Sequence, residues 1–99
     1  MPIRGKKQRF TDTNISKAPN SDGVYGIYRG QELTYIGKGE GKNGIKSRLQ
    51  AAQRENRSKG NATSFRVEKC RNPSEREKWL LEQYKKLHGK LPRYNAKVG

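Results

Sequence analysis

A stretch of glycine and tyrosine near the start of the chain constrains the fold more than any other segment. Residues 24–28 and 33–37 form two runs rich in β-branched and aromatic side chains, separated by four residues that include Gly30. This pattern is typical of a β-hairpin, whose turn would lie at Gly30 and Gln31. We therefore take the hairpin as the element around which the remaining chain is organised.

The predicted register places two tyrosines on one face of this hairpin. With the turn at the predicted place, Gly26 lies opposite Tyr35, and successive side chains alternate between the two faces. Tyr28 and Tyr35 then share a face with Gly26 and Gly37, and the two bare glycine positions leave room for a phosphate backbone to approach. Tyr25 is expected on the opposite face. The alternative is that the tyrosines only fill a half-buried sheet.

The charge of the chain favours a polyanionic partner. Its 99 residues include 23 lysines and arginines against 9 acidic residues, which gives a net charge of +14. Nucleic acid is the first candidate partner for so basic a chain. No apolar run approaches the roughly 18 residues of a membrane span and no signal peptide is visible, so we expect a cytoplasmic protein, associated with the nucleoid in a bacterium. Cys70 is the only cysteine, which excludes an internal disulfide.

The residues before the hairpin are predicted to form a basic arm. Residues 1–22 contain five lysines and arginines but few apolar anchors. This composition favours a mobile or loosely docked arm that contacts phosphates, or one that only improves solubility. We therefore expect two parts, the arm at 1–22 and one small domain at 23–99.

After the hairpin, the pattern predicts a helix, a strand and a second helix. A basic loop at 38–44, whose glycines allow backbone N–H groups to turn toward an anion, leads to a helix at about 45–54. An alternating strand follows at 64–70, and a helix begins after Asn72 and ends at Gly89. The order β-β-α-β-α predicts a small α+β fold with a three-stranded antiparallel sheet flanked by helices.

Two charged residues occupy unusual places in these helices. On a helical wheel of the second helix, Glu77 falls in the apolar stripe that contains Leu80, Tyr84 and Leu87. A carboxylate on the core side is costly unless it is paired or binds a cation, so Glu77 is either salt-bridged or functional. Arg48 lies at the edge of the apolar stripe of the first helix, about 70° from its centre, so its guanidinium can lean toward the sheet.

Together these features resemble the GIY-YIG nuclease family. The resemblance covers residues 23–97. It rests on the triplets at 26–28 (GIY) and 35–37 (YIG), an arginine in the following helix, the run at 77–83 and the final Pro-Arg-Tyr-Asn at 92–95. The last two segments are most similar to the nuclease domain of the bacterial excision-repair incision subunit. The resemblance implies an endonuclease that hydrolyses DNA, most often double-stranded, with Mg²⁺ or Mn²⁺ as cofactor.

The resemblance also implies a role for each matching residue. Tyr28 would be the general base or would position the attacking water, Tyr35 would orient that water, and Lys38 would favour a nearby phenolate. Arg48 would hold the scissile phosphate and stabilise the transition state. Glu77 would bind one divalent ion that acts as a Lewis acid on the leaving oxygen.

Further residues would support the site or contact DNA. Asn95 matches the terminal asparagine that supports the site in the family. The DNA-contacting residues would be Lys38, Lys42, Lys46, Arg48 and Arg54. One departure is Ala52, because family members often carry a histidine or tyrosine one turn after the arginine. One alternative is therefore a catalytically silent nucleic-acid-binding module of the same fold. Another is a basic RNA-binding protein, which would explain the charge but neither the facing tyrosines nor Glu77. A homodimer or a separate partner would supply specificity.

Overall fold

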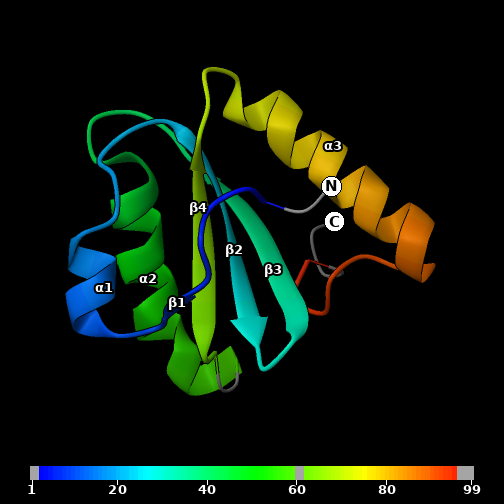
Figure 1. Ribbon diagram of the computed structural model, residues 1–99, viewed down its shortest axis with the longest axis horizontal. Coiled ribbons are helices and arrows are strands. Elements are labelled where there is room, and N and C mark those ends of the chain that lie inside the picture. The colour runs from blue at the N-terminus through cyan, green and yellow to red at the C-terminus, as the bar shows by residue number, and fades with distance from the viewer. Residues whose placement is uncertain (1–2, 60–61, 96–99) are drawn as a thin grey trace.

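The computed structural model describes residues 3–59 and 62–95 and shows helices packed on both faces of one sheet (Figure 1). In chain order its elements are β1 (Gln8–Arg9), α1 (Asp12–Ser16), β2 (Gly23–Arg29), β3 (Glu32–Gly39), α2 (Gly44–Lys59), β4 (Ser64–Lys69) and α3 (Pro73–His88). The strands lie in the order β1-β4-β2-β3, and each neighbouring pair is antiparallel. α1 and α2 cover one face of the sheet, and α3 covers the other (Figure 1). None of the helices in these residues is long and apolar enough to cross a membrane.

The predicted α+β class is confirmed, but the predicted count of three strands is wrong. The additional strand is β1, which pairs Gln8 with Phe65 and Arg9 with Ser64. A strand of two residues is too short to produce a detectable alternation in the sequence. The first predicted helix also continues beyond Arg54, because α2 ends at Lys59.

The segment 3–22 is not the loosely docked arm that its composition suggested. Ile3 and Ile15 are both buried, Ile3 in the cluster against α3 and Ile15 in the cluster against α2. Gly5 crosses β4 so closely that the carbonyl of Val67 leaves no room for a Cβ. A few well-placed apolar side chains therefore dock this segment onto the sheet.

The hairpin of β2 and β3 forms with the predicted turn. Gly30 has a φ of 61°, which suits the first central position of a type II′ turn, and Arg29 pairs with Glu32. The register shifts after the next pair, where Thr34 is inserted as a β-bulge. The buried Thr34 hydroxyl donates a hydrogen bond to the carbonyl of Ile27 at 3.1 Å, which satisfies the inserted side chain.

The bulge changes which tyrosine shares a face of the sheet with Tyr35. Tyr35 lies opposite Ile27 instead of Gly26, and Gly37 lies opposite Tyr25. Tyr25 and Tyr35 therefore pack on the α2 side of the sheet, whereas Tyr28 lines a cavity against α3. The prediction that Tyr28 and Tyr35 share a face is wrong, because one inserted residue changes the phase of the alternation.

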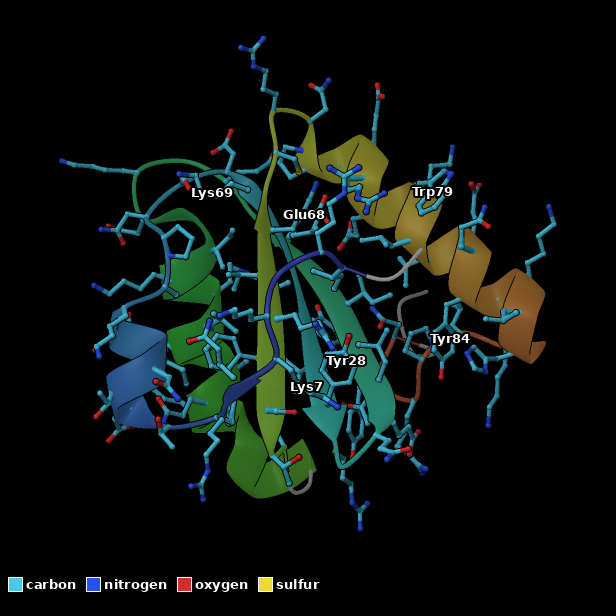
Figure 2. The ribbon with its side chains drawn as sticks, in the orientation of Figure 1. Lys7, Tyr28, Glu68, Lys69, Trp79 and Tyr84 are labelled. Atoms are coloured by element: carbon cyan, nitrogen blue, oxygen red, sulfur yellow. The ribbon has the colours of Figure 1, made fainter. Side chains whose placement is uncertain are left out.

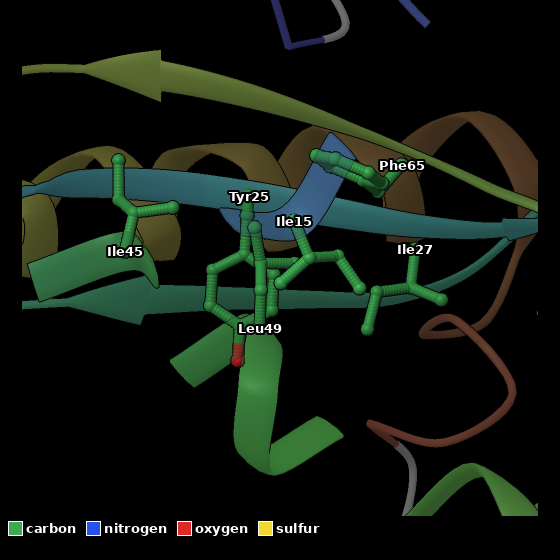
Figure 3. Packing of buried hydrophobic residues seen from close by; sticks show 6 residues of the cluster. All are labelled: Ile15, Tyr25, Ile27, Ile45, Leu49 and Phe65. Carbon is green, nitrogen blue, oxygen red and sulfur yellow. The ribbon is translucent and has the colours of Figure 1, made fainter. Parts of the chain in front are cut away.

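Two apolar clusters fill the two faces of the sheet. The cluster against α2 consists of Ile15, Tyr25, Ile27, Ile45, Leu49 and Phe65 (Figure 3). The cluster against α3 consists of Ile3, Val24, Ile36 and Leu80. Leu80 is buried as predicted, but Leu87 from the same predicted stripe is 81% exposed. The C-terminal half of α3 thus packs less closely on the sheet than its N-terminal half.

Candidate active site at the end of β3

Two tyrosine rings meet on the α2 side of the hairpin. Tyr25 comes from β2 and Tyr35 from β3, and their ring centroids are 6.0 Å apart. A Cβ on Gly37 would lie 2.5 Å from the Tyr25 hydroxyl and 2.8 Å from the Tyr35 ring. The two rings can therefore pack over the strand only because position 37 is a glycine.

Arg48 joins this pair from α2. Ile45 and Leu49 bury the adjacent face of the helix, and the exposed Arg48 reaches the Tyr25 hydroxyl with a hydrogen bond. Burial and the neighbouring Tyr35 raise the pKa of Tyr25 far above its ordinary range, while the Arg48 guanidinium opposes that rise. The Arg48 guanidinium thus leans toward the sheet, as predicted.

Glu77 approaches the same region from α3. Its half-buried carboxyl has a raised pKa, chiefly because of burial and further because of the charge of Glu40; the cations Lys38 and Arg48 partly offset the rise. Charges on β3, in the following loop and on α2 therefore act on this one carboxyl of α3. Of the predicted residues, Tyr35 and Arg48 lie on the α2 side of β3, Lys38 and Glu77 lie on its α3 side, and the charge of Arg48 acts on the Glu77 carboxyl.

Lys38 connects the end of β3 to the first turn of α3. Its ammonium donates a hydrogen bond to the Ser74 hydroxyl at 2.5 Å and forms an ion pair with Glu40 at 3.6 Å. Ser74 precedes Glu77 by three residues, so the bond fixes the turn of α3 from which Glu77 projects. Neither Ser74 nor Glu40 was predicted, since exposed serine and glutamate residues give no distinctive sequence signal.

A divalent cation would find few protein ligands here. Within residues 3–59 and 62–95 the structure contains no group of three or more histidine, cysteine, aspartate or glutamate side chains suited to a metal. Mg²⁺ is, however, commonly held by one or two carboxylates, with water and substrate phosphates completing its shell. Glu77 with the nearby Glu40 fits that smaller donor set.

Asn95 supports the outer edge of β3. Its buried side chain accepts a hydrogen bond from the Ile36 N–H at 2.8 Å and donates one to the Ile36 carbonyl at 2.9 Å. The Tyr94 N–H donates to the Thr34 carbonyl at 2.9 Å. The C-terminal segment thereby pairs the otherwise open edge of β3 and holds the backbone between Tyr35 and Gly37.

Tyr28 is not part of this group. It lies on the other face of the sheet, where the Lys7 ammonium is 4.5 Å from its ring centroid and the Arg66 guanidinium 5.7 Å (Figure 2). Burial raises the pKa of Tyr28, and Arg66 opposes the rise. The tyrosine that accompanies Tyr35 is Tyr25, which the sequence prediction missed.

A sequence signal for Tyr25 was present. The triplet Gly23-Val24-Tyr25 has the same pattern as the triplet Gly26-Ile27-Tyr28, namely a glycine, a β-branched residue and a tyrosine. Either triplet could pair with the one at 35–37. Only the register of the hairpin distinguishes them, and the bulge decides it in favour of Tyr25.

Part of the backbone at the basic loop before α2 is already hydrogen-bonded within the protein. The Gly41 N–H donates to the Asp22 carboxylate at 2.9 Å, and the Ile45 N–H donates to the Ser21 carbonyl at 3.0 Å. The segment before β2 therefore satisfies these groups within the protein. The predicted backbone anion site at this loop stays a prediction for its other amides.

The predicted DNA-contacting residues do not all lie together. Lys42 and Arg54 are exposed, whereas Lys46 is half-buried. At 100° per residue, Lys46 and Arg48 flank the apolar stripe of α2 on opposite sides, and Arg54 points away from it. Only Lys38 and Arg48 from this set act on the candidate site.

The comparison with known families gives one match. The family described as Domain of unknown function (DUF7508) matches residues 1–86. The chain belongs to this family. The matched region includes the segment 3–22 that packs onto the sheet and extends through Glu77, but it ends before Asn95. No curated protein and no solved structure matches the chain, so the resemblance to GIY-YIG nucleases stays a prediction.

Proposed function

We propose that the chain is a metal-dependent endonuclease that hydrolyses phosphodiester bonds in DNA. One observation carries the proposal: Arg48 hydrogen-bonds Tyr25 beside Tyr35, and its charge, like that of Lys38, also acts on the Glu77 carboxyl, whose pKa is raised. Such a set supplies what phosphodiester hydrolysis needs, because cations hold the phosphate, hydroxyls orient water and a carboxylate holds a metal ion.

The two tyrosines would have different roles in placing the attacking water. Tyr25 takes the place that the resemblance gave to Tyr28, and burial raises its pKa, which disfavours the phenolate that a general base would need. Its hydrogen bond to Tyr35 orients the Tyr35 hydroxyl. Tyr35 is half-buried and therefore open to water. Tyr35 would orient the attacking water, with Tyr25 as a positioning residue.

The charged residues hold the phosphate and the ion. Arg48 is exposed at the edge of the site, where its guanidinium would bind the scissile phosphate and stabilise the charge added during attack. Glu77, with Glu40 beside it, would hold Mg²⁺ or Mn²⁺, and a bound cation would relieve the cost of its half-buried charge. The ion, when bound, supplies a Lewis acid for the leaving 3′ oxygen.

A catalytically silent DNA-binding module of the same fold is the second candidate. It is favoured by Ala52, which packs against the α2-side cluster one turn after Arg48 and offers no proton acceptor. In this alternative the charge of +14 would bind DNA without cutting it. In either case the specificity would come from a homodimer or a separate partner, because phosphate contacts carry no sequence information.

Nicking of supercoiled plasmid separates the two candidates. The wild type would be assayed with Mg²⁺ and with EDTA, next to Glu77→Gln and the matched control Glu82→Gln, which alters an exposed carboxylate on the same helix. We expect Mg²⁺-dependent nicking that Glu77→Gln reduces at least about 100-fold and Glu82→Gln leaves unchanged. Binding without nicking in every lane would contradict the nuclease and support the silent module.

Arg48→Ala tests the phosphate contact in the same assay. Removing a charged donor to the reacting phosphate should lower the nicking rate about 100-fold or more. Lys78→Ala removes an equal charge from the exposed side of α3, at a residue with no predicted DNA contact, and should change the rate little. Equal losses in the two variants would show that Arg48 contributes only general charge.

A further inference from the structure

The face of the sheet opposite Tyr25 contains a cavity that the proposed chemistry does not use. It measures about 500 Å³ and lies between the turn end of the hairpin and the C-terminal half of α3. This volume is within the range of sites that bind small ligands. Figure 2 shows Tyr28 and Tyr84, which both line the cavity, on the same side of the sheet.

Flat rings form part of the cavity wall. Tyr28 lies on the sheet side, while Tyr84 and His88 come from α3 and stack on each other with ring centroids 4.1 Å apart. Leu33 and Leu80 complete an apolar floor. Aromatic side chains over an apolar floor favour a ligand with a planar ring, because stacking of two flat π-systems is energetically favourable.

Amide side chains give the cavity a polar edge. Gln31 enters from the hairpin turn and Gln83 from α3. A glutamine amide donates and accepts hydrogen bonds at once, which is the combination that the edge of a nucleobase offers in return. An aliphatic ligand would offer these two amides no hydrogen-bond partner.

Cations lie beside two of the residues that line the cavity, Tyr28 and Glu32. Lys7 lies over the Tyr28 ring. Glu32, the carboxylate of the lining, is paired by Arg93 through two hydrogen bonds of 3.2 Å, and these bonds together with the charge of Lys90 lower its pKa. The charge of the Glu32 carboxylate is thus already compensated by Arg93. The positive charge of the other nearby cations therefore favours an anionic ligand group such as a phosphate.

We propose that this cavity binds the base of a nucleotide, with the phosphate of that nucleotide near the cations beside Tyr28 and Glu32. Tyr84 lies seven residues after Glu77 on the same face of α3, which is about 10 Å along the helix axis. A base of the strand held near Glu77 could therefore reach the cavity if it is unpaired or turned out of the duplex. Binding of a nucleotide stands independently of nuclease activity, whereas the link to the strand at Glu77 rests on the proposed function.

The test is an NMR titration of the ¹⁵N-labelled protein with each of the four deoxynucleoside monophosphates in EDTA. We expect saturable shifts of the amide signals of Gln31, Gln83 and Leu87 with at least one nucleotide. Inorganic phosphate and ribose 5-phosphate should not reproduce these shifts, because they lack a base. A lack of saturable shifts, or the same shifts with ribose 5-phosphate, would overturn the proposal.

Variants place the binding in the cavity. Gln83→Ala and Tyr84→Leu should each weaken binding about tenfold, by removing the amide and the flat ring respectively. Gln50→Ala changes an exposed amide on α2 and should leave the affinity unchanged. The spectra themselves show that each variant is folded. Unchanged affinity in both cavity variants would overturn the proposal, and since no metal or cleavage is involved, this result would leave the nuclease proposal standing.

Discussion

Tyr25 and Tyr28 lie three residues apart on β2 with the same sequence pattern around them, yet their surroundings differ completely. Tyr25 packs against α2 with its hydroxyl beside Tyr35 and Arg48. Tyr28 faces α3, under Lys7 and at the wall of a cavity. The difference shows that the face of the sheet, and not the triplet itself, decides which tyrosine can share in chemistry.

The two faces should differ most in how much their apolar side chains stabilise the fold. Leu49 on the α2 side is 0% exposed, and Leu87 on the α3 side is 81% exposed. Leu49→Ala should lower the free energy of unfolding by about 2–5 kcal/mol because it leaves a cavity, whereas Leu87→Ala should change it by less than about 0.5 kcal/mol. Urea denaturation followed by circular dichroism measures both, and equal losses would contradict a closed α2 face and an open end of α3.

Gly37→Ala tests the close packing of the two site tyrosines. The added methyl would lie 2.5 Å from the Tyr25 hydroxyl and 2.8 Å from the Tyr35 ring. The rings must move, so the free energy of unfolding should fall by about 1–3 kcal/mol and the aromatic NMR signals of both tyrosines should shift. A variant as stable as the wild type with unmoved signals would show that the rings do not pack over the strand.

Glu68 has a compensated charge, in contrast to Glu77. Burial raises the pKa of Glu68, but hydrogen bonds from Arg76 at 2.8 and 3.1 Å and from the Arg4 N–H at 3.1 Å outweigh it, so the pKa is lowered. The ionised form therefore stabilises the fold above the ordinary carboxyl pKa of 4.5, and this contribution is lost as the pH falls through the lowered value. Glu68→Gln should cost about 1 kcal/mol at neutral pH.

Glu77→Gln should have the opposite and smaller effect. Because the pKa of Glu77 is raised, the folded state favours the protonated carboxyl, and the cost of ionising it appears as the pH rises above 4.5. The substitution should therefore raise the free energy of unfolding at neutral pH by less than about 1 kcal/mol, with no gain near pH 3. Urea titrations at both pH values measure the two variants together. A loss of stability in Glu77→Gln at neutral pH would indicate a structural ion pair.

Local patterns predicted much of this arrangement. The glycine at position 30 marked the turn, Asn72 and Gly89 bounded α3, and Glu77 stood out as a carboxylate on an apolar stripe. These features depend on residues close together in the sequence, where propensity and spacing are informative. The hairpin and the helix that carries Glu77 were therefore predictable.

The face of each tyrosine was not predicted, because it depends on a single inserted residue. Thr34 fits a strand equally well with or without a bulge, and the bond of its hydroxyl to Ile27 exists only in the folded sheet. The spacing of Leu33 and Ile36 could have indicated the bulge. Two apolar residues three apart share a face of a strand only if a residue is inserted between them.

The central claim is that Tyr25 and Tyr35, and not Tyr28, serve the reaction at the end of β3. Measuring plasmid nicking by Tyr25→Phe, Tyr35→Phe and Tyr28→Phe tests it most directly, because each variant keeps the ring and loses only the hydroxyl. We predict that the first two lower the Mg²⁺-dependent rate at least about tenfold and that Tyr28→Phe stays within about twofold of the wild type. A large loss in Tyr28→Phe with full activity in Tyr35→Phe would contradict the claim.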